Sequence, residues 1–324
     1  MLSEVVVVPR AMAQRHPAGA VGDAVFRALT LVFALVVLLI LGGIIVSLLD
    51  GALPALKKFG LGFLVTDRWN PVTEKFGALA PIYGTLVTSL IAMLIAIPVA
   101  FGIALFITEL CPVWLKRPLA TTIELLAAIP SIIYGIWGLF VLAPFVQDYI
   151  EPALIGSLGQ VPGVGLLFAG PPLGIGVLTA GFILSVMVLP LISSIMRDVF
   201  ETVPAVLKES AYALGATTTE IAWQVVLPYT RIGVVGGILL GLGRALGETM
   251  AVTFVIGNSY HINLSILQPG TTISAALANE FTEAVGDLYL SSLIALGLIL
   301  FAITLVVLAI ARLLLSRLQQ RAGS

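Results

Sequence analysis

Long apolar runs alternate with shorter polar intervals along the chain. Runs of membrane-spanning length cover residues 24–49, 81–108, 119–146, 173–195, 231–257 and 289–315. Crossing the hydrocarbon core of a bilayer takes about 20 helical residues. With 59% hydrophobic and 10% charged residues, the 324-residue chain cannot hide its apolar surface in a water-soluble globule. The pattern therefore predicts an all-α, polytopic integral membrane protein with six transmembrane helices.

The polar interval at about 201–228 carries helix signals of its own. Thr202 can cap a short helix over residues 203–214, because its hydroxyl accepts a hydrogen bond from a free backbone N–H. Gly215 is the natural residue to end that helix in the left-handed conformation.

A second helix start follows at once in the same interval. Thr217 and Glu220 have the Thr-x-x-Glu spacing of a capping box, and Pro228 is expected to limit the second helix to residues 221–227. Two short helices between apolar runs favour a docking surface for a partner. The alternative is an amphipathic linker that rests on the membrane surface.

The fifth apolar run contains two ionisable residues, Arg244 and Glu248. Four residues apart on one helix, they share a face and can pair. Arg244 lies about 20 Å along the helix from Arg231, so neither group is expected to reach water along lipid. We therefore expect both to face the bundle interior or a transport pathway. A structural ion pair that fixes helix packing is the alternative.

Positive charges predict the orientation of the chain. One side is expected to hold eleven Lys and Arg residues and the other side four. The first group is Arg10, Arg15, Arg27, Lys116, Arg117, Arg197, Lys208, Arg231, Arg312, Arg317 and Arg321, and the second is Lys57, Lys58, Arg68 and Lys75. The positive-inside rule then places both termini and the 201–228 interval in the cytoplasm. The predicted organisation is a cytoplasmic tail at 1–23, a membrane domain at 24–315 and a cytoplasmic tail at 316–324.

Three further positions carry expectations. Pro130 predicts a kink in the third helix, and Glu124 near its cytoplasmic end is either an ordinary interfacial carboxylate or a group near an inner gate. Trp69, in the first outer loop, is either anchored at the lipid headgroups or in contact with an extracytoplasmic partner.

Several kinds of chemistry are excluded by what the sequence lacks. No lysine follows a glycine, so the Gly-Lys-Ser/Thr core of a P-loop is absent, and energy must come from another chain or an ion gradient. Cys111 is the single cysteine, and no His, Cys or carboxylate cluster has metal-ligand spacing, so we expect no metal site. No basic patch suits nucleic acid. An intramembrane enzyme is disfavoured, because no paired-carboxylate or His-rich motif lies in the apolar runs.

The 201–228 interval resembles the cytoplasmic EAA loop of ABC importer permeases. The matching residues are Glu209, Ser210, Ala211, Gly215, Val225, Leu227 and Pro228. Three flanking segments, LGRALGETMAV (242–252), ELLAAIPSIIYGIWGLFVLAP (124–144) and FGALAPIYGTLVTSLIAMLIAIP (76–98), together look like the membrane subunits of the phosphate-specific importer, closer to the C-type than to the A-type. The resemblance covers roughly residues 24–315 and implies the MetI-like transmembrane fold.

This resemblance implies a heteromeric importer in which the chain does no covalent chemistry. Its expected partners are a homologous second permease subunit, two copies of a cytosolic ABC ATPase that dock on the EAA loops, an extracytoplasmic phosphate-binding protein and membrane lipid. ATP and Mg²⁺ would be bound by the ATPase, so this chain needs no cofactor. Closure of the ATPases would pull the coupling helices and open the pathway outward by alternating access.

The resemblance also implies residue roles. Arg244 would present positive charge to the passing phosphate and Glu248 would hold the arginine, with Thr249 and Ser131 adding hydroxyls to the pathway. The alternatives are a permease for another oxyanion such as molybdate or sulfate, the second phosphate subunit, or a secondary transporter driven by protons through Arg244 and Glu248.

Overall fold

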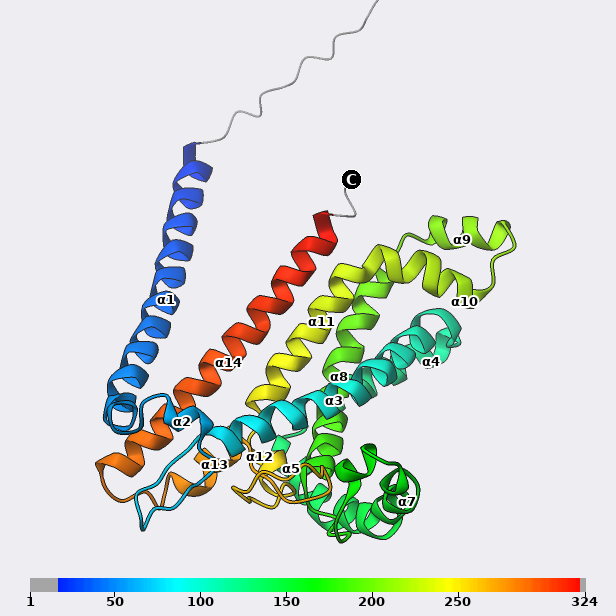
Figure 1. Cartoon of the computed structure of the whole chain (residues 1–324). Helices are drawn as coiled ribbons and strands as arrows, with labels where there is room; N and C mark the ends of the chain where they lie inside the picture. The colour runs from blue at the N-terminus through cyan, green and yellow to red at the C-terminus, as the bar shows by residue number, and fades with distance from the viewer. Residues whose placement is uncertain (1–16, 321–324) are drawn as a thin grey trace, which may run out of the picture. The chain divides into compact units, whose positions relative to one another are not determined.

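Helices dominate residues 17–320, which are the residues described by this computed structural model. The chain divides into two compact units, one ending at Asp50 and the other beginning at Gly51. The α-helices (Figure 1) are α1 (Pro17–Phe59), α2 (Gly62–Val65), α3 (Leu79–Leu105), α4 (Val113–Ala127), α5 (Ser131–Trp137), α6 (Ala143–Phe145), α7 (Glu151–Ser157), α8 (Val177–Glu201), α9 (Ala205–Ala213), α10 (Thr218–Ile221), α11 (Leu227–Gly247), α12 (Met250–Thr253), α13 (Ile273–Glu280) and α14 (Asp287–Gln320).

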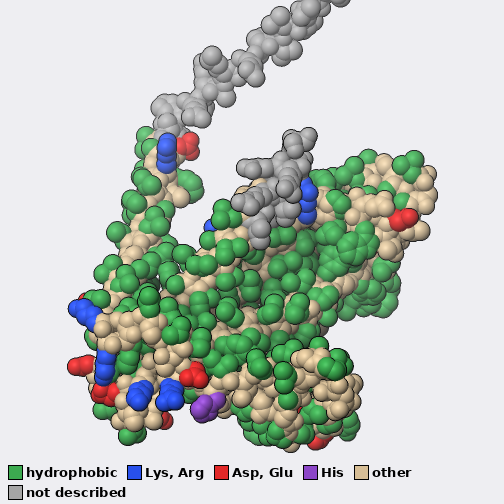
Figure 2. All heavy atoms as spheres, viewed as in Figure 1, with side chains coloured by type: hydrophobic (Ala, Val, Ile, Leu, Met, Phe, Trp, Pro, Cys, Tyr) green, Lys and Arg blue, Asp and Glu red, His purple; other side chains and the backbone are tan. Residues whose placement is uncertain are grey.

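Six helical stretches of the described residues are long and apolar enough to cross a membrane, which confirms the predicted number. They are Val21–Phe59, Leu79–Leu110, Ser131–Gln160, Val177–Glu201, Thr218–Gly247 and Asp287–Leu313. The first helix runs past the predicted end at residue 49, because the charges that close the apolar run do not break a helix. Figure 2 shows hydrophobic side chains over most of the visible surface of the second unit, with charged side chains near its ends.

The predicted third span, 119–146, is wrong in its boundaries. Helix α4 ends at Ala127, and a new helix begins at Ser131 after Pro130, whose ψ of 136° is extended. Proline cannot donate a backbone hydrogen bond and disfavours the helical conformation of the residue before it. The helix therefore ends here, where only a kink was predicted. The helical stretch then continues to Gln160, into the interval between the third and fourth apolar runs.

Helix α8 is the centre of the larger core, and it packs against α3 and α11. Its side chains Ile183, Met187, Ile192 and Met196 are all but completely buried. Small residues allow the close contact with α11: a Cβ at Gly241 would come within 2.6 Å of Ile192. Gly233, Gly237 and Gly241 of the fifth apolar run therefore serve helix packing, as small residues do in membrane bundles.

A second core joins α2, α13 and α14 at the end of the second unit opposite α9 and α10 (Figure 1). Trp69 belongs to it: its ring stacks on Tyr260 with centroids 5.4 Å apart and meets Phe76 edge to face at 4.9 Å. The Tyr260 hydroxyl donates to the Glu280 carboxylate at 3.1 Å, and the Tyr289 hydroxyl donates to the same group. Trp69 is thus held by Phe76 from its own loop and by Tyr260 from a distant part of the chain, a role that neither expectation for it included.

The loop between α12 and α13 is anchored to α3 by a close backbone contact. The Ile273 N–H donates to the Thr85 hydroxyl at 2.9 Å. Beside this bond, a Cβ at Gly84 would lie only 1.9 Å from the carbonyl oxygen of Thr271. Glycine is therefore required at residue 84 by contact between two backbones.

The predicted tails overlap the two terminal helices where the structure describes them. Residues 17–23 belong to α1 and residues 316–320 to α14. The rest of both predicted tails, with Arg10, Arg15 and Arg321, lies outside the described residues.

Candidate functional site: a pair of short helices and a broken membrane helix

Helix α9 is a short, exposed helix with a well-formed C-terminus. The N–H of Ala216 donates to the carbonyl of Ala211 at 3.1 Å, and the N–H of Gly215 donates to that of Tyr212 at 2.9 Å. These two bonds form a Schellman motif, with Gly215 left-handed at a φ of 88°. The predicted end of the helix is confirmed.

The predicted start of α9 is wrong. Its N-cap is Pro204, and Thr202 instead lies at the C-terminus of α8, where its hydroxyl donates to the carbonyl of Val199 at 2.7 Å. Proline has a fixed φ close to the helical value, which suits it to a helix start.

Helix α10 begins with the predicted capping box. The Glu220 N–H donates to the Thr217 hydroxyl oxygen, and the Glu220 carboxylate accepts from the Thr217 N–H at 2.8 Å. The bonds from Thr217 to this carboxylate lower the pKa of Glu220 below its usual value.

The predicted end of this second helix at Pro228 is wrong. The helix continues without interruption from Thr218 to Gly247 through a π-helical turn, Ala222–Val226. In that turn the Leu227 N–H reaches back five residues to the carbonyl of Ala222. This wider spacing lets the chain pass Pro228, which cannot donate the next bond.

The EAA-loop residues divide into an exposed set and a packed set. Glu209, Ser210 and Gly215 are exposed, as is Pro228. Ala211, Val225 and Leu227 are partly buried against the larger core. The loop therefore exposes polar side chains next to large apolar ones, since Val206 and Leu214 are exposed as well, while Ala211, Val225 and Leu227 hold it to the membrane helices.

Two ion-pair groups, which sequence analysis did not predict, tie this end of the bundle together. Lys208 of α9 lies with its Nζ 2.5 Å from Oε1 of Glu109, in the π-helical turn Phe106–Leu110 that follows α3. Arg197 of α8 pairs with Glu124 of α4 at 2.9 Å and with the adjacent Asp198 at 2.7 Å. Glu124 is therefore bound to α8. The available sequence signal was only that Glu109, Glu124 and Arg197 lie near the ends of apolar runs.

The predicted pair of Arg244 and Glu248 does not form. Helix α11 ends at Gly247, and Glu248 has an extended ψ of 132°, so the two side chains no longer share a helix face. Within residues 17–320, no ion pair joins them. The Glu248 carboxylate instead accepts from the N–H of Ala251 at 3.3 Å, at the start of α12. A local side chain to backbone bond thus competes with the helix.

Arg244 is exposed on the surface of this chain, which contradicts the expectation that it could lie in the bundle interior. It occupies the last turn of α11, where the helix dipole favours a positive charge. Charged groups inside membranes rarely face lipid. An exposed arginine on a membrane helix therefore suits a surface covered by another subunit or a pathway between subunits.

The helix breaks bring the remaining predicted site elements together. Helix α5, which begins with Ser131, packs against α12, which follows Thr249. The contact is close at Gly135, where a Cβ would lie 2.7 Å from the Phe254 ring and 3.1 Å from the carbonyl oxygen of Met250. Ser131 and Thr249 are both partly exposed, and the Thr249 hydroxyl donates to the carbonyl of Gly247 at 3.4 Å.

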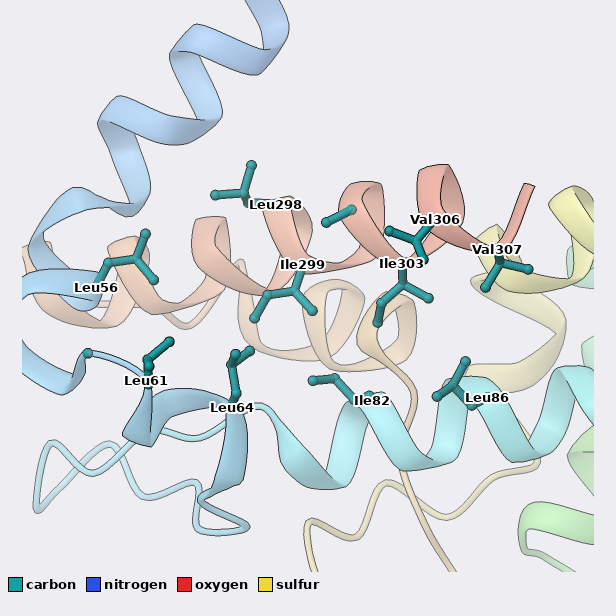
Figure 3. A pocket seen from close by; sticks show the side chains of 12 residues that line it. Leu56, Leu61, Leu64, Ile82, Leu86, Leu298, Ile299, Ile303, Val306 and Val307 are labelled. Atoms are coloured by element: carbon teal, nitrogen blue, oxygen red, sulfur yellow. The ribbon is translucent and has the colours of Figure 1, made fainter. Parts of the chain in front are cut away.

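An apolar groove of about 760 Å³ lies in the second unit. Figure 3 shows Leu61, Leu64, Ile82 and Leu86 along one side of it, Leu298, Ile299, Ile303, Val306 and Val307 along the other, and Leu56 at one end. Because its lining carries no charged side chain, it offers nothing to bind an anion. Among the described residues, no group of three or more His, Cys, Asp or Glu side chains is placed to hold a metal ion.

Comparison with known proteins identifies the family. Residues 96–320 match the family described as "Binding-protein-dependent transport system inner membrane component". The chain is 62% identical over 94% of its length to a phosphate transport system permease protein PstC from Mesorhizobium japonicum, and it covers 93% of that protein. It is 56% identical over 93% of its length to PstC from Pasteurella multocida, covering 94%. A probable PstC from Methanocaldococcus jannaschii is 40% identical over 87% of this chain, which covers 90% of it.

A solved structure supports the predicted fold. A chain of the MetNI methionine ABC transporter in an inward-facing conformation is 16% identical, with a TM-score of 0.50, and the match covers 76% of this chain and 94% of that one. At this identity the likeness concerns the fold alone, and it confirms the predicted MetI-like architecture. The chain is a multi-pass membrane protein that belongs to the family of binding-protein-dependent transport system inner membrane components and, within it, to the group of the PstC permeases.

Proposed function

We propose that the chain is one of two permease subunits of an ABC importer that moves inorganic phosphate into the cytoplasm. The observation that carries this proposal is the 62% identity, over nearly the whole chain, to a phosphate transport system permease. The chain performs no covalent chemistry. A homologous second permease subunit would complete the channel, with membrane lipid around both.

Helices α9 and α10 form the docking site for a cytosolic ABC ATPase in this proposal. The support is their exposed surface, which combines Glu209, Ser210 and the turn at Gly215 with the apolar side chains of Val206 and Leu214. Two ATPase copies, one on each permease subunit, bind ATP and Mg²⁺, so this chain carries no cofactor. Caps at Gly215 and Thr217 make the segment a pair of defined helices that can transmit force.

The α9–α10 end is then the cytoplasmic end, and both termini lie on that side, as the distribution of Lys and Arg predicts. The opposite end, with α2, α7 and α13, faces an extracytoplasmic phosphate-binding protein.

The substrate pathway runs along the exposed face of α11 in this proposal. Arg244 presents the positive charge, and Glu248, Thr249 and Ser131 line the region where α11 is interrupted. The support is that Arg244 is exposed on a membrane helix and has no ion pair among the described residues. A single unpaired arginine can attract an anion without the dense positive charge that would prevent its release. Closure of the ATPases would move α9 and α10 and open this pathway alternately to each side.

The test is uptake of labelled phosphate into vesicles that contain the chain with its partner subunits. We expect ATP-dependent uptake that Arg244→Gln lowers by more than about tenfold, since a charge-assisted contact is lost, while the ATPase stays bound. Gly215→Val should weaken ATPase binding, because a β-branched residue does not tolerate a φ of 88°. Gly236→Ala, in α11 with open space around it, is the matched control.

Each rival function gives a different result in the same assay. Stronger competition by molybdate or sulfate than by unlabelled phosphate would indicate another oxyanion. Uptake by the chain alone, without ATP and abolished by collapsing the proton gradient, would refute the importer and support a secondary transporter. If Arg244→Gln supported full uptake, Arg244 would have a structural role and would not be needed in the substrate pathway.

A further inference from the structure

The ion pair between Lys208 and Glu109 differs from the other ion pairs of the described residues. Its two side chains are 18% and 7% exposed. Each of the other pairs has a partner more than half exposed: Glu74 with Lys58, and Glu124 and Asp198 with Arg197. Exposed ion pairs contribute little, whereas removing one partner of a buried pair leaves a charge without compensation. The contact of Lys208 with Glu109 is therefore costly to separate.

This pair joins α9 to the end of a long membrane helix. Lys208 immediately precedes Glu209, and its side chain turns inward while Glu209 stays exposed. Helix α9 has no fully buried residue of its own, so few contacts tie it to the bundle. Glu109 lies in the turn after α3, where Lys116 also donates to the carbonyl of Thr108 at 2.8 Å.

Helix α3 extends from this contact to the opposite end of the bundle. Its 27 residues correspond to about 40 Å of helix. It packs along α8, and at its first turns Gly84 and Thr85 contact the loop that follows α12. A displacement applied at Glu109 can therefore reach the neighbourhood of the broken helix through one packed element.

We propose that the Lys208–Glu109 pair is the link through which motion of α9 is transmitted to α3. The inference rests on the proposed function, since it assumes that an ATPase moves α9. When α9 is displaced, α3 follows, because separation would leave the Glu109 carboxylate buried and unpaired. Lys208 and Glu109 are positioning residues in this scheme and do not touch the substrate.

The test measures phosphate moved per ATP hydrolysed in vesicles that contain the assembled importer. Lys208→Met should retain the bound ATPase and its ATP hydrolysis, but should lower phosphate per ATP by about tenfold or more, as expected when a buried charge pair no longer resists separation. Lys58→Met is the matched control: it removes a 2.7 Å ion pair at the opposite end of the bundle and should leave the ratio unchanged.

Two double variants separate transmission from folding. Lys208→Met with Glu109→Gln leaves no buried charge and should assemble normally but remain uncoupled. Lys208→Glu with Glu109→Lys should restore most of the ratio, because it rebuilds the pair in reverse. A native ratio in the neutral double variant would overturn the inference, since packing without charge would then suffice. Absence of ATP-dependent phosphate uptake in the unmodified importer would instead refute the proposed function.

Discussion

Replacing Gly84 by alanine should destabilise the protein far more than the same change elsewhere in α3. The added Cβ would lie 1.9 Å from the carbonyl oxygen of Thr271, where such atoms essentially never approach within 3.0 Å. The obstacle is backbone, so no side chain rotation relieves it. The loop must retreat by more than about 1 Å, a displacement that costs the tight packing of this region. The retreat also stretches the hydrogen bond from the Ile273 N–H to the Thr85 hydroxyl.

The magnitude follows from three terms. Overpacking costs about 1–3 kcal/mol, and loss of the buried hydrogen bond costs about 0.5–1.5 kcal/mol. The gain in helix propensity from glycine to alanine is about 0.5–1 kcal/mol. Gly102→Ala is the matched control, because it lies in the same helix with nothing within 4 Å of the added Cβ and so keeps only the propensity term. We expect Gly84→Ala to be less stable than Gly102→Ala by about 1.5–4.5 kcal/mol.

Thermal unfolding of the purified chain in detergent, followed by the loss of the monodisperse peak on size-exclusion chromatography, provides the comparison. Gly84→Ala should melt clearly below the native protein, and Gly102→Ala at or slightly above it. Equal melting temperatures for the two variants would refute the argument, since they would show that the contact with Thr271 either yields at no cost or is absent.

Further predictions concern the capping box and the aromatic cluster. Thr217→Val removes the cap, and local stability of the α9–α10 segment should fall by about 0.5–2 kcal/mol, measured as faster amide hydrogen exchange; unchanged exchange would contradict it. Because the pKa of Glu220 is lowered in the folded chain, the cap is fully effective above the ordinary value of about 4.3 and is lost as the pH falls through the lowered one. After correction for the intrinsic pH dependence of amide exchange, protection of the native segment should therefore fall on acidification, and less so in Thr217→Val. Tyr260→Phe keeps the stack on Trp69 but removes a hydrogen bond to the Glu280 carboxylate. The free energy of unfolding should therefore fall by about 1.5–3 kcal/mol, measured as a lower melting temperature. Burial and Glu280 raise the pKa of Tyr260, so its contribution is full below about pH 10 and is lost as the pH rises further. Trp69 fluorescence should change as the pH rises and this contribution is lost. If Tyr260→Phe showed a fluorescence change at alkaline pH as large as that of the native protein, Tyr260 would not be the cause of the change.

Helix-forming signals that depend on neighbouring residues were predictable from the sequence. The six apolar runs indicated six membrane helices, and the described residues form six helical stretches that are long and apolar enough to cross a membrane. Gly215 ends α9 and the Thr217–Glu220 capping box opens α10, as their spacing indicated. Such signals are local, because each is satisfied by hydrogen bonds within one helical turn.

Residues that are compatible with two different local conformations were predicted less well. Pro130 separates two helices, whereas Pro228 is passed by a π-helical turn, although each proline sits in an apolar setting. The neighbouring packing decides between a break and a bulge, and that packing comes from residues far away in the chain. Thr202 likewise lies between two helices and could cap either one. Its hydroxyl bonds to the carbonyl of Val199, in the helix that precedes it.

The sequence by itself determined the class of protein, because the free energy of placing six apolar segments in water allows no other environment than a membrane. It also determined which residues carry ionisable groups at membrane depth. Only the tertiary structure decided which of them meet. Arg244 and Glu248 are four residues apart and remain separate, since the helix ends between them, while Lys208 and Glu109, 99 residues apart, form a part-buried pair. Ion pairs depend on distances of a few ångströms, and those distances are set by where α3, α9 and α11 pack.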